Sequence, residues 1–353
     1  MEPRDAKYLL AYTIPVVTLV AIWFAGIWSW LTVVVAFVII PIIEIMLKGT
    51  NKNLSADQKA KKEKSIFFEL LLYINVILVY GIGSFYLYKI TNTELEWSEM
   101  LGLTLSTGIL LGANGINVAH ELGHKSGKFQ KIAAKLLLLP SLYMHFIIEH
   151  NRGHHLRVGT PEDPATSRLG ENVFQFWFRS VTAGYFSAWS IANADLEKTG
   201  KYRFSLKNHM IQFSIIQSLY LILVGLVFGI VGVAAAVCTA VVSFLLLETI
   251  NYLEHYGLER KRLANGKYER VENFHSWNSN HEVGRILLYE LTRHSDHHYK
   301  AYKKYQILDD YPDSPQLPFG YPTGILVALI PPIWFKIMNP RVEKWREEHD
   351  FQK

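Results

Sequence analysis

Six apolar stretches, each about 20 residues long, constrain the fold of this chain more than any other feature of its sequence. A helix of about 20 apolar residues spans the hydrocarbon core of a bilayer. The first stretch is not a cleaved signal peptide, because apolar sequence resumes directly at Trp28 without a small-residue cleavage site. The sequence therefore predicts an all-α membrane protein with a bundle of six transmembrane helices. The predicted spans are residues 8–27, 28–47, 67–87, 100–118, 211–230 and 231–252.

The charges of the connecting loops predict the orientation. Residues 48–64 are rich in lysine, whereas residues 91–99 carry three glutamates and no lysine or arginine. Lysine-rich loops stay in the cytoplasm, and with six spans both termini then lie on that side. We expect a single domain over residues 1–353, with cytoplasmic metal-binding segments at 119–205 and 253–353.

Two further apolar stretches are shorter than a typical span. Residues 131–146 are expected to lie on the membrane or to dip into it. Residues 323–338 are interrupted by Pro331 and Pro332, which break a helix, so we expect a re-entrant or interfacial hairpin there.

Three histidine clusters carry the chemistry of the chain. They read HELGH from residue 120, HNRGHH from residue 150 and HSDHH from residue 294. The spacings i, i+3 and i+4 place imidazoles on one face of a helix. Imidazole is a ligand for iron, copper, zinc and nickel, and eight nitrogen donors exceed the six that one octahedral ion can use. The clusters therefore predict two metal ions bound by His120, His124, His150, His154, His155, His294, His297 and His298.

A ninth histidine lies at the end of the sixth predicted span. Taken alone, a histidine at a helix end such as His255 is more often a cation that complements the helix dipole than a ligand, but the predicted topology brings all three clusters to the same end of the bundle. We therefore expect His255 to be a further ligand. The other histidines lack the paired spacing, and we expect them to be hydrogen-bonded or solvated; they are His145, His209, His275, His281 and His349.

Other metal-dependent functions fit the clusters less well. The sequence HELGH also matches the zinc-protease motif, in which Glu121 would be the general base. That site needs one further ligand and leaves the other two clusters unused. Transporters place ionisable ligands within the membrane, whereas these clusters lie beyond the predicted spans. A structural zinc site normally uses cysteine, and the only cysteine is Cys238.

The three histidine boxes resemble those of the membrane di-iron superfamily of desaturases, hydroxylases and alkane monooxygenases. Within it, NYLEHYGL at 251–258 and LTRHSDHH at 291–298 resemble the AlkB-type alkane 1-monooxygenases and their xylene monooxygenase relatives. Three further stretches carry the same resemblance: GTPEDPATSRLGE from residue 159, HSWNSNHEV from residue 275 and PQLPFGYP from residue 315.

The resemblance implies a non-haem di-iron site with nine histidine ligands, including His255, and dioxygen as cosubstrate. It implies hydroxylation of the terminal methyl group of medium- or long-chain n-alkanes to primary alcohols. A xylene-type methyl group or a fatty-acid terminus is the alternative substrate within the superfamily, and a zinc metalloprotease acting through HELGH is the alternative from another class. The expected location is a bacterial inner membrane.

Two sets of neighbouring residues are candidates for supporting roles. Carboxylates next to the ligands could orient their imidazole rings; these are Glu121, Glu149, Glu254 and Asp296. Bulky residues of the second and sixth spans could line a narrow hydrocarbon channel that ends at the histidines; these are Phe37, Ile40, Leu245 and Leu246.

The chain has no sequence motif for a redox cofactor that would deliver electrons. It lacks GxGxxG, a flavin fingerprint and CxxC pairs, and we expect no flavin, haem, nucleotide or nucleic acid to be bound. The resemblance implies rubredoxin, a small acidic protein, as the electron donor, with a rubredoxin reductase upstream. The net charge of +5 and the cations Arg152, Arg157 and Arg168 suit an acidic partner, and they also suit anionic membrane lipids.

Overall fold

The computed structural model describes residues 3–47 and 49–349. Within these residues the chain is helical, and the only β interactions are the isolated bridges between Arg262 and Tyr268 and between Asn278 and Gln316. The predicted all-α class is confirmed.

The membrane-spanning half is built from long apolar helices. Five helical segments are long and apolar enough to cross a bilayer: Pro3–Phe24, Gly26–Met46, Ile66–Asn92, Trp97–Gly123 and His209–His255. The first combines η1 (Pro3–Tyr12) with α1 (Thr13–Phe24), and the third is α5 (Ile66–Asn92). The second consists of η2 (Gly26–Trp30), α2 (Leu31–Val34), η3 (Val35–Ile39) and α3 (Ile40–Met46). The fourth consists of α6 (Trp97–Leu110), η4 (Leu111–Ile116) and α7 (Asn117–Gly123).

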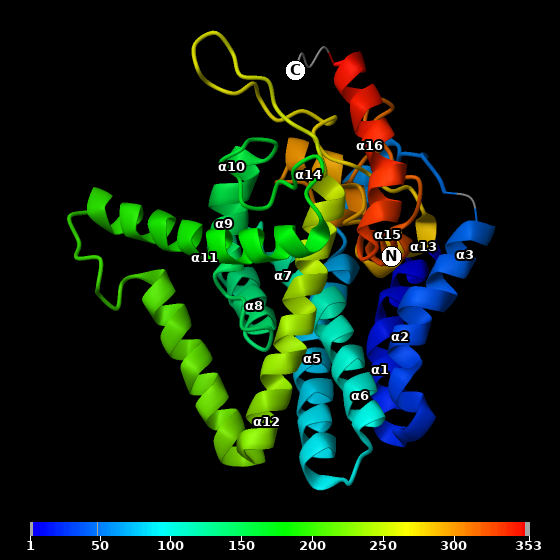
Figure 1. Ribbon diagram of the computed structural model, residues 1–353, viewed down its shortest axis with the longest axis vertical. Helices are drawn as coiled ribbons and strands as arrows, with labels where there is room; N and C mark the ends of the chain where they lie inside the picture. Colours follow the sequence, from blue (N-terminus) through cyan, green and yellow to red (C-terminus); the bar gives the residue numbers. More distant parts are fainter. Residues whose placement is uncertain (1–2, 48, 350–353) are drawn as a thin grey trace.

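The last of these segments contains both of the remaining predicted spans. Helix α12 (His209–His255) is interrupted at Gly229, whose φ of 66° and ψ of −171° are non-helical. Glycine takes such a positive φ without a steric penalty. The chain reverses there, and the two limbs of α12 form a V that opens towards the upper end of the bundle (Figure 1). The predicted spans 211–230 and 231–252 therefore correspond to the two limbs, and the predicted bundle is confirmed.

The connections between paired spans and the histidine-rich segments lie at opposite ends of the bundle. Figure 1 shows the turns between α1 and α2, between α5 and α6 and within α12 at its lower end. The upper end holds α9 (Phe146–Glu149), α10 (His155–Arg157) and α14 (His294–Tyr299). The histidine clusters thus gather at one end of the bundle, as the topology predicts.

Several shorter helices complete the upper half. Residues 131–146 were expected to lie on the membrane or to dip into it. The first part of this stretch belongs to helix α8 (Lys128–Leu138), which packs against α7 and α5. Helix α11 (Val173–Lys198) begins with a capping box between Asn172 and Gln175 and runs across the direction of the spans (Figure 1). Helices α15 (Tyr321–Ala328) and α16 (Pro331–Glu348) meet at an angle of 118°, which agrees with the predicted break at Pro331 and Pro332.

Candidate metal centre

The nine predicted histidine ligands converge in two sets. In each set the candidate donor nitrogens all lie within 4.8 Å of one another. The five-histidine set contains His120, His124, His150, His155 and His297. The four-histidine set contains His154, His255, His294 and His298.

Ring nitrogens within each set point towards a common centre. In the five-histidine set, the Nε2 atom of His150 lies 3.2 Å from that of His124 and 3.0 Å from that of His155. The Nε2 atom of His297 lies 3.2 Å from that of His155. In the four-histidine set, Nε2 of His154 lies 3.1 Å from Nε2 of His298, and the Nε2 atoms of His255 and His294 are 3.3 Å apart.

A π-helical turn decides how the second box is divided. Residues His150–His154 form the π-helix η5, whose hydrogen bonds join residues i and i+5. This winding brings His150 beside His155 and sends His154 to the other set. An α-helical spacing would place His150 and His154 on one face, whereas in the π-helical turn they belong to different sets.

Neighbouring histidines are divided in the third box as well. His297 and His298 follow each other on α14 and belong to different sets. Successive residues on a helix point in directions about 100° apart, so two adjacent imidazoles can serve two separate ions. His255, at the end of α12, is fully buried and completes the four-histidine set.

Most of these imidazoles are held in the neutral form that a metal requires. Burial lowers the pKa of His124 to about 3. Burial and neighbouring histidines hold the pKa values of His150 and His155 well below the usual range. His154 is different: burial lowers its pKa, but the carboxylates of Asp163, Glu149 and Glu248 together outweigh burial and raise it.

The donor set fits a pair of transition-metal ions. Nε2 of His120 is buried and has no hydrogen-bond partner within the described residues, although a buried polar nitrogen normally has one. A metal ion would use this lone pair. Both sets offer imidazole nitrogens, which suit iron, copper, zinc and nickel.

Two carboxylates contact the histidines directly. An Oδ of Asp163 lies 2.8 Å from Nδ1 of His154, so it can fix the tautomer and orientation of that ring. Asp163 was not among the sequence candidates. It lies within the stretch from residue 159 that carries the family resemblance, but no helical spacing links it to His154. Glu254 was a candidate, and its Oε2 lies 3.2 Å from Nε2 of His294, while Tyr321 donates a hydrogen bond of 2.7 Å to its other oxygen.

The other three carboxylate candidates bind groups outside the histidine sets. Glu121 forms an ion pair with Lys125 and accepts a hydrogen bond from the backbone N–H of Tyr305. Glu149 pairs with Arg157 at 2.8 Å. Asp296 accepts hydrogen bonds from Lys303, Tyr311 and the backbone N–H of Asp309. These contacts tie together the segments that carry the histidines.

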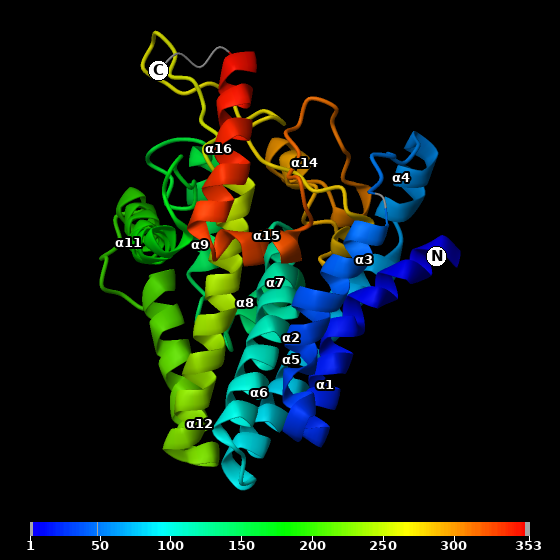
Figure 2. The ribbon, with the colours of Figure 1, turned by 45° about the vertical axis from the view of Figure 1, so that its right-hand side comes forward.

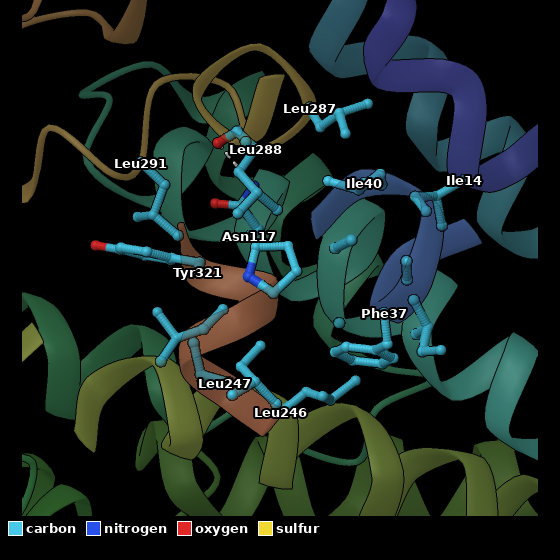
Figure 3. A pocket seen from close by; sticks show the side chains of 18 residues that line it. Ile14, Phe37, Ile40, Asn117, Leu246, Leu247, Leu287, Leu288, Leu291 and Tyr321 are labelled. Carbon is cyan, nitrogen blue, oxygen red and sulfur yellow. Dashed lines mark hydrogen bonds between the residues drawn. The ribbon is translucent and has the colours of Figure 1, made fainter. Parts of the chain in front are cut away.

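An apolar cavity of about 80 Å³ lies within the bundle (Figure 3). Among the predicted channel residues, Phe37, Ile40 and Leu246 line it. Leu245 does not, and its neighbour Leu247 lines the cavity instead.

One end of this cavity lies close to the metal centre. Asn117, in the lining, lies about one helical turn before His120 on α7, and Leu291, also in the lining, lies in the turn that leads into α14 at His294. Tyr321, also in the lining, hydrogen-bonds Glu254, which contacts His294. The arrangement can hold an apolar chain with its end directed towards the histidines.

The three arginine candidates for partner docking differ in the ion pairs that they form. Arg152 is half-exposed and forms a two-pronged ion pair with Asp195. Arg157 is bound by Glu149 and donates a hydrogen bond of 2.6 Å to Ser187. Arg168 is exposed and has no side-chain ion pair among the described residues.

Comparison with known proteins identifies relatives over nearly the whole chain. The sequence pattern of the fatty acid desaturase family matches residues 96–323. Alkane 1-monooxygenase 2 of Pseudomonas aeruginosa is 37% identical over 92% of this chain and 87% of its own length. An alkane 1-monooxygenase of Pseudomonas putida is 36% identical over 98% of this chain and 87% of its own. The hydroxylase component of xylene/toluene monooxygenase from Pseudomonas putida is 28% identical over 96% of this chain and 90% of its own.

Proposed function

Because the chain belongs to the fatty acid desaturase family and, within it, to the alkane 1-monooxygenases, we propose that it hydroxylates the terminal methyl group of n-alkanes. The net reaction consumes one alkane, one dioxygen, two electrons and two protons, and yields a primary alcohol and water. The observation that carries the proposal is the convergence of nine histidines in two sets, beside an apolar cavity whose lining includes Asn117, one helical turn before His120.

Two iron ions are the proposed cofactor. His120, His124, His150, His155 and His297 would hold one ion, and His154, His255, His294 and His298 would hold the other. When bound, iron supplies the activation of dioxygen that no side chain can perform. The protein supplies neutral imidazoles, and Asp163 holds the ring of His154 in one tautomer.

Substrate selection is assigned to the apolar cavity. Relative to water, each buried methylene contributes about 0.8 kcal/mol wherever it lies along the hydrocarbon. Contact area alone therefore does not define which carbon reacts. The position of the cavity would define it: Phe37 and Leu246 in the lining would contact the hydrocarbon, and its end would approach Asn117, one helical turn before His120. Terminal attack follows because the hydrocarbon would reach the metal centre end-on through this cavity.

The proposed electron donor is an acidic carrier of the rubredoxin type. Of the nine clustered histidines, only His124 and His155 are partly exposed, and both belong to the five-histidine set. Electrons therefore have their shortest route through this set. A groove beside His124 is lined by Lys125, Lys131 and Lys135 and by Arg152, and its positive charge suits an acidic partner. Arg168 does not line this groove and remains a separate docking candidate.

The proposed orientation places the metal centre at the cytoplasmic face of a bacterial inner membrane. The lysine-rich segment that contains α4 (Ala56–Glu63) lies towards the same end of the bundle as the histidines (Figure 2). Positive loops remain in the cytoplasm, where an electron carrier is available.

A zinc protease acting through HELGH is a weaker alternative. A protease of that type needs a free glutamate to activate water, but Glu121 is bound by Lys125 and by the backbone N–H of Tyr305. His120 and His124 also share their set with three further histidines, more than a catalytic zinc ion uses.

Activity and metal content test the proposal together. The purified protein is reconstituted with a carrier and supplied with octane, dodecane and xylene, and the products are identified by mass spectrometry. We expect 1-alkanols and about two irons per chain. Oxidation of xylene alone would assign the alkyl-aromatic alternative, and one zinc with no iron and no oxidation would contradict the monooxygenase.

A further inference from the structure

A basic cavity of about 350 Å³ lies apart from the apolar cavity. Its walls come from η1, from the loop before α4 and from the segment that includes α13 (Glu282–Leu287) and the residue preceding α14. Six cationic side chains line it: Arg4, Lys7, Lys52, Lys62, Arg285 and Arg293.

Positive charge exceeds negative charge in this basic cavity. Lys7 pairs with Glu282 at 2.8 Å, Arg285 pairs with Glu290 at 2.7 Å, and Lys62 pairs with Asp5 just outside the lining. Subtracting these three carboxylates from the six cations leaves three positive charges. Arg4 and Lys52 have no ion pair within the described residues. An anion is therefore the expected ligand.

A buried guanidinium provides a second, independent indication. Arg293 is 2% exposed and donates hydrogen bonds to the carbonyl oxygens of Leu308 and Lys52, at 2.5 Å and 3.1 Å. Its Nε atom has no hydrogen-bond acceptor in the described part of the chain, and the nearest carboxylate oxygen, on Glu290, is 3.9 Å away. A buried donor without an acceptor is costly, and an anionic oxygen in the cavity would remove that cost.

The position of the cavity indicates the source of the anion. Segment η1 forms the first part of the first span, and Lys62 lies four residues before α5. Leu10 on η1 and Ile66 and Leu70 on α5 are exposed apolar side chains, as expected for residues that contact lipid. Figure 2 shows the N-terminal segment and α4 on the same side of the bundle.

We propose that this basic cavity binds a phosphate group, with the headgroup of an anionic phospholipid as its source. Arginine and lysine are the side chains that proteins use to bind phosphate, and basic pockets between spans at headgroup depth bind anionic lipids. Free inorganic phosphate offers the same chemistry, and the experiment separates the two sources.

Occupancy of the basic cavity would stabilise the third histidine box. Arg293 precedes His294 directly, and its guanidinium joins the loop at Lys52 to the segment at Leu308. Arg285 similarly donates a hydrogen bond of 3.0 Å to the carbonyl oxygen of Thr50. Neutralising these arginines reduces their mutual repulsion and holds the three segments together. The proposal is independent of the reaction that the metal centre performs.

Thermal unfolding of the detergent-purified full chain tests the site. Tryptophan fluorescence is followed while phosphatidylglycerol, phosphatidylcholine or inorganic phosphate is added at constant ionic strength. We expect phosphatidylglycerol to raise the Tm and phosphatidylcholine to leave it unchanged. A rise with inorganic phosphate alone would assign the site to the free anion, and no rise with either anion would overturn the proposal.

Charge-reversal variants locate the effect in the cavity. Arg4→Glu and Lys52→Glu change exposed, unpaired side chains, so both variants should fold. Each should weaken phosphatidylglycerol binding about tenfold, which is the loss expected on removing one hydrogen bond to a charged group. Lys61→Glu, exposed on α4 outside the lining, is the matched control and should bind normally. Equal weakening in all three variants would reduce the effect to general surface charge and refute a defined site.

Discussion

Replacing Phe37 should change the length of alkane that the enzyme prefers. Phe37 lies on η3 in the second span and lines the apolar cavity opposite α12, where Leu246 also lines it (Figure 3). Phe37→Ala removes a phenyl ring from the wall, and about three methylenes occupy a similar volume. Measured against alkane in water, each methylene that gains a place contributes about 0.8 kcal/mol, or about fourfold in kcat/KM, so about 60-fold is the upper limit for three methylenes of a substrate that also dissolves in the bilayer. Phe37→Trp should shift the optimum towards shorter chains.

The assay is a competition among n-alkanes of increasing length, with each alcohol quantified by mass spectrometry. Leu246→Ala and Leu245→Ala form a matched pair on α12, because only Leu246 lines the cavity. The first should alter the chain-length profile, and the second should leave it unchanged. Terminal selectivity should persist in all variants, since the histidine end is untouched. An unaltered profile in Phe37→Ala and Leu246→Ala would refute the cavity as the substrate channel, and a change to secondary alcohols would place Phe37 beside the reacting carbon.

Three further predictions concern the metal centre and its partner. His255→Ala should lower iron content and activity without preventing membrane insertion, whereas His281→Ala should retain iron; normal iron content in the first variant would remove His255 from the ligand set. Metal-free protein should lose stability as the pH falls from about 7 to about 4. The histidines of the unfolded chain bind protons near pH 6.5, whereas burial lowers the pKa of His124 in the folded protein to about 3. A Tm that is constant over this range would contradict the buried, neutral state of the histidines. Arg168→Glu should raise the KM for an acidic carrier at low salt and leave iron content unchanged, with the difference disappearing at high salt; an equal KM in both proteins would exclude Arg168 from the docking surface.

The apolar lengths, the loop charges and the histidine spacings are local properties, and they were sufficient to predict the helical bundle and the nine histidines that come together. A stretch of about 20 apolar residues must be helical in a bilayer wherever it lies in the chain. The same reasoning predicted that the clusters share one end of the bundle, because the number of spans before a cluster decides on which side of the membrane it lies. It also identified Phe37, Ile40 and Leu246, since bulky residues on spans face either lipid or a neighbouring helix.

The division of the histidines into sets of five and four depends on tertiary structure. Whether His154 joins His150 or His298 is decided by the π-helical winding of η5 and by the packing of α14 against it, and neither has a signature in residue spacing. Asp163 reaches His154 through a loop, so no periodicity relates the two. The lining of the basic cavity brings together residues as far apart in the sequence as Arg4 and Leu308. Side chains so distant in sequence meet only because the helices that carry them pack together, and that packing energy is a property of the whole fold.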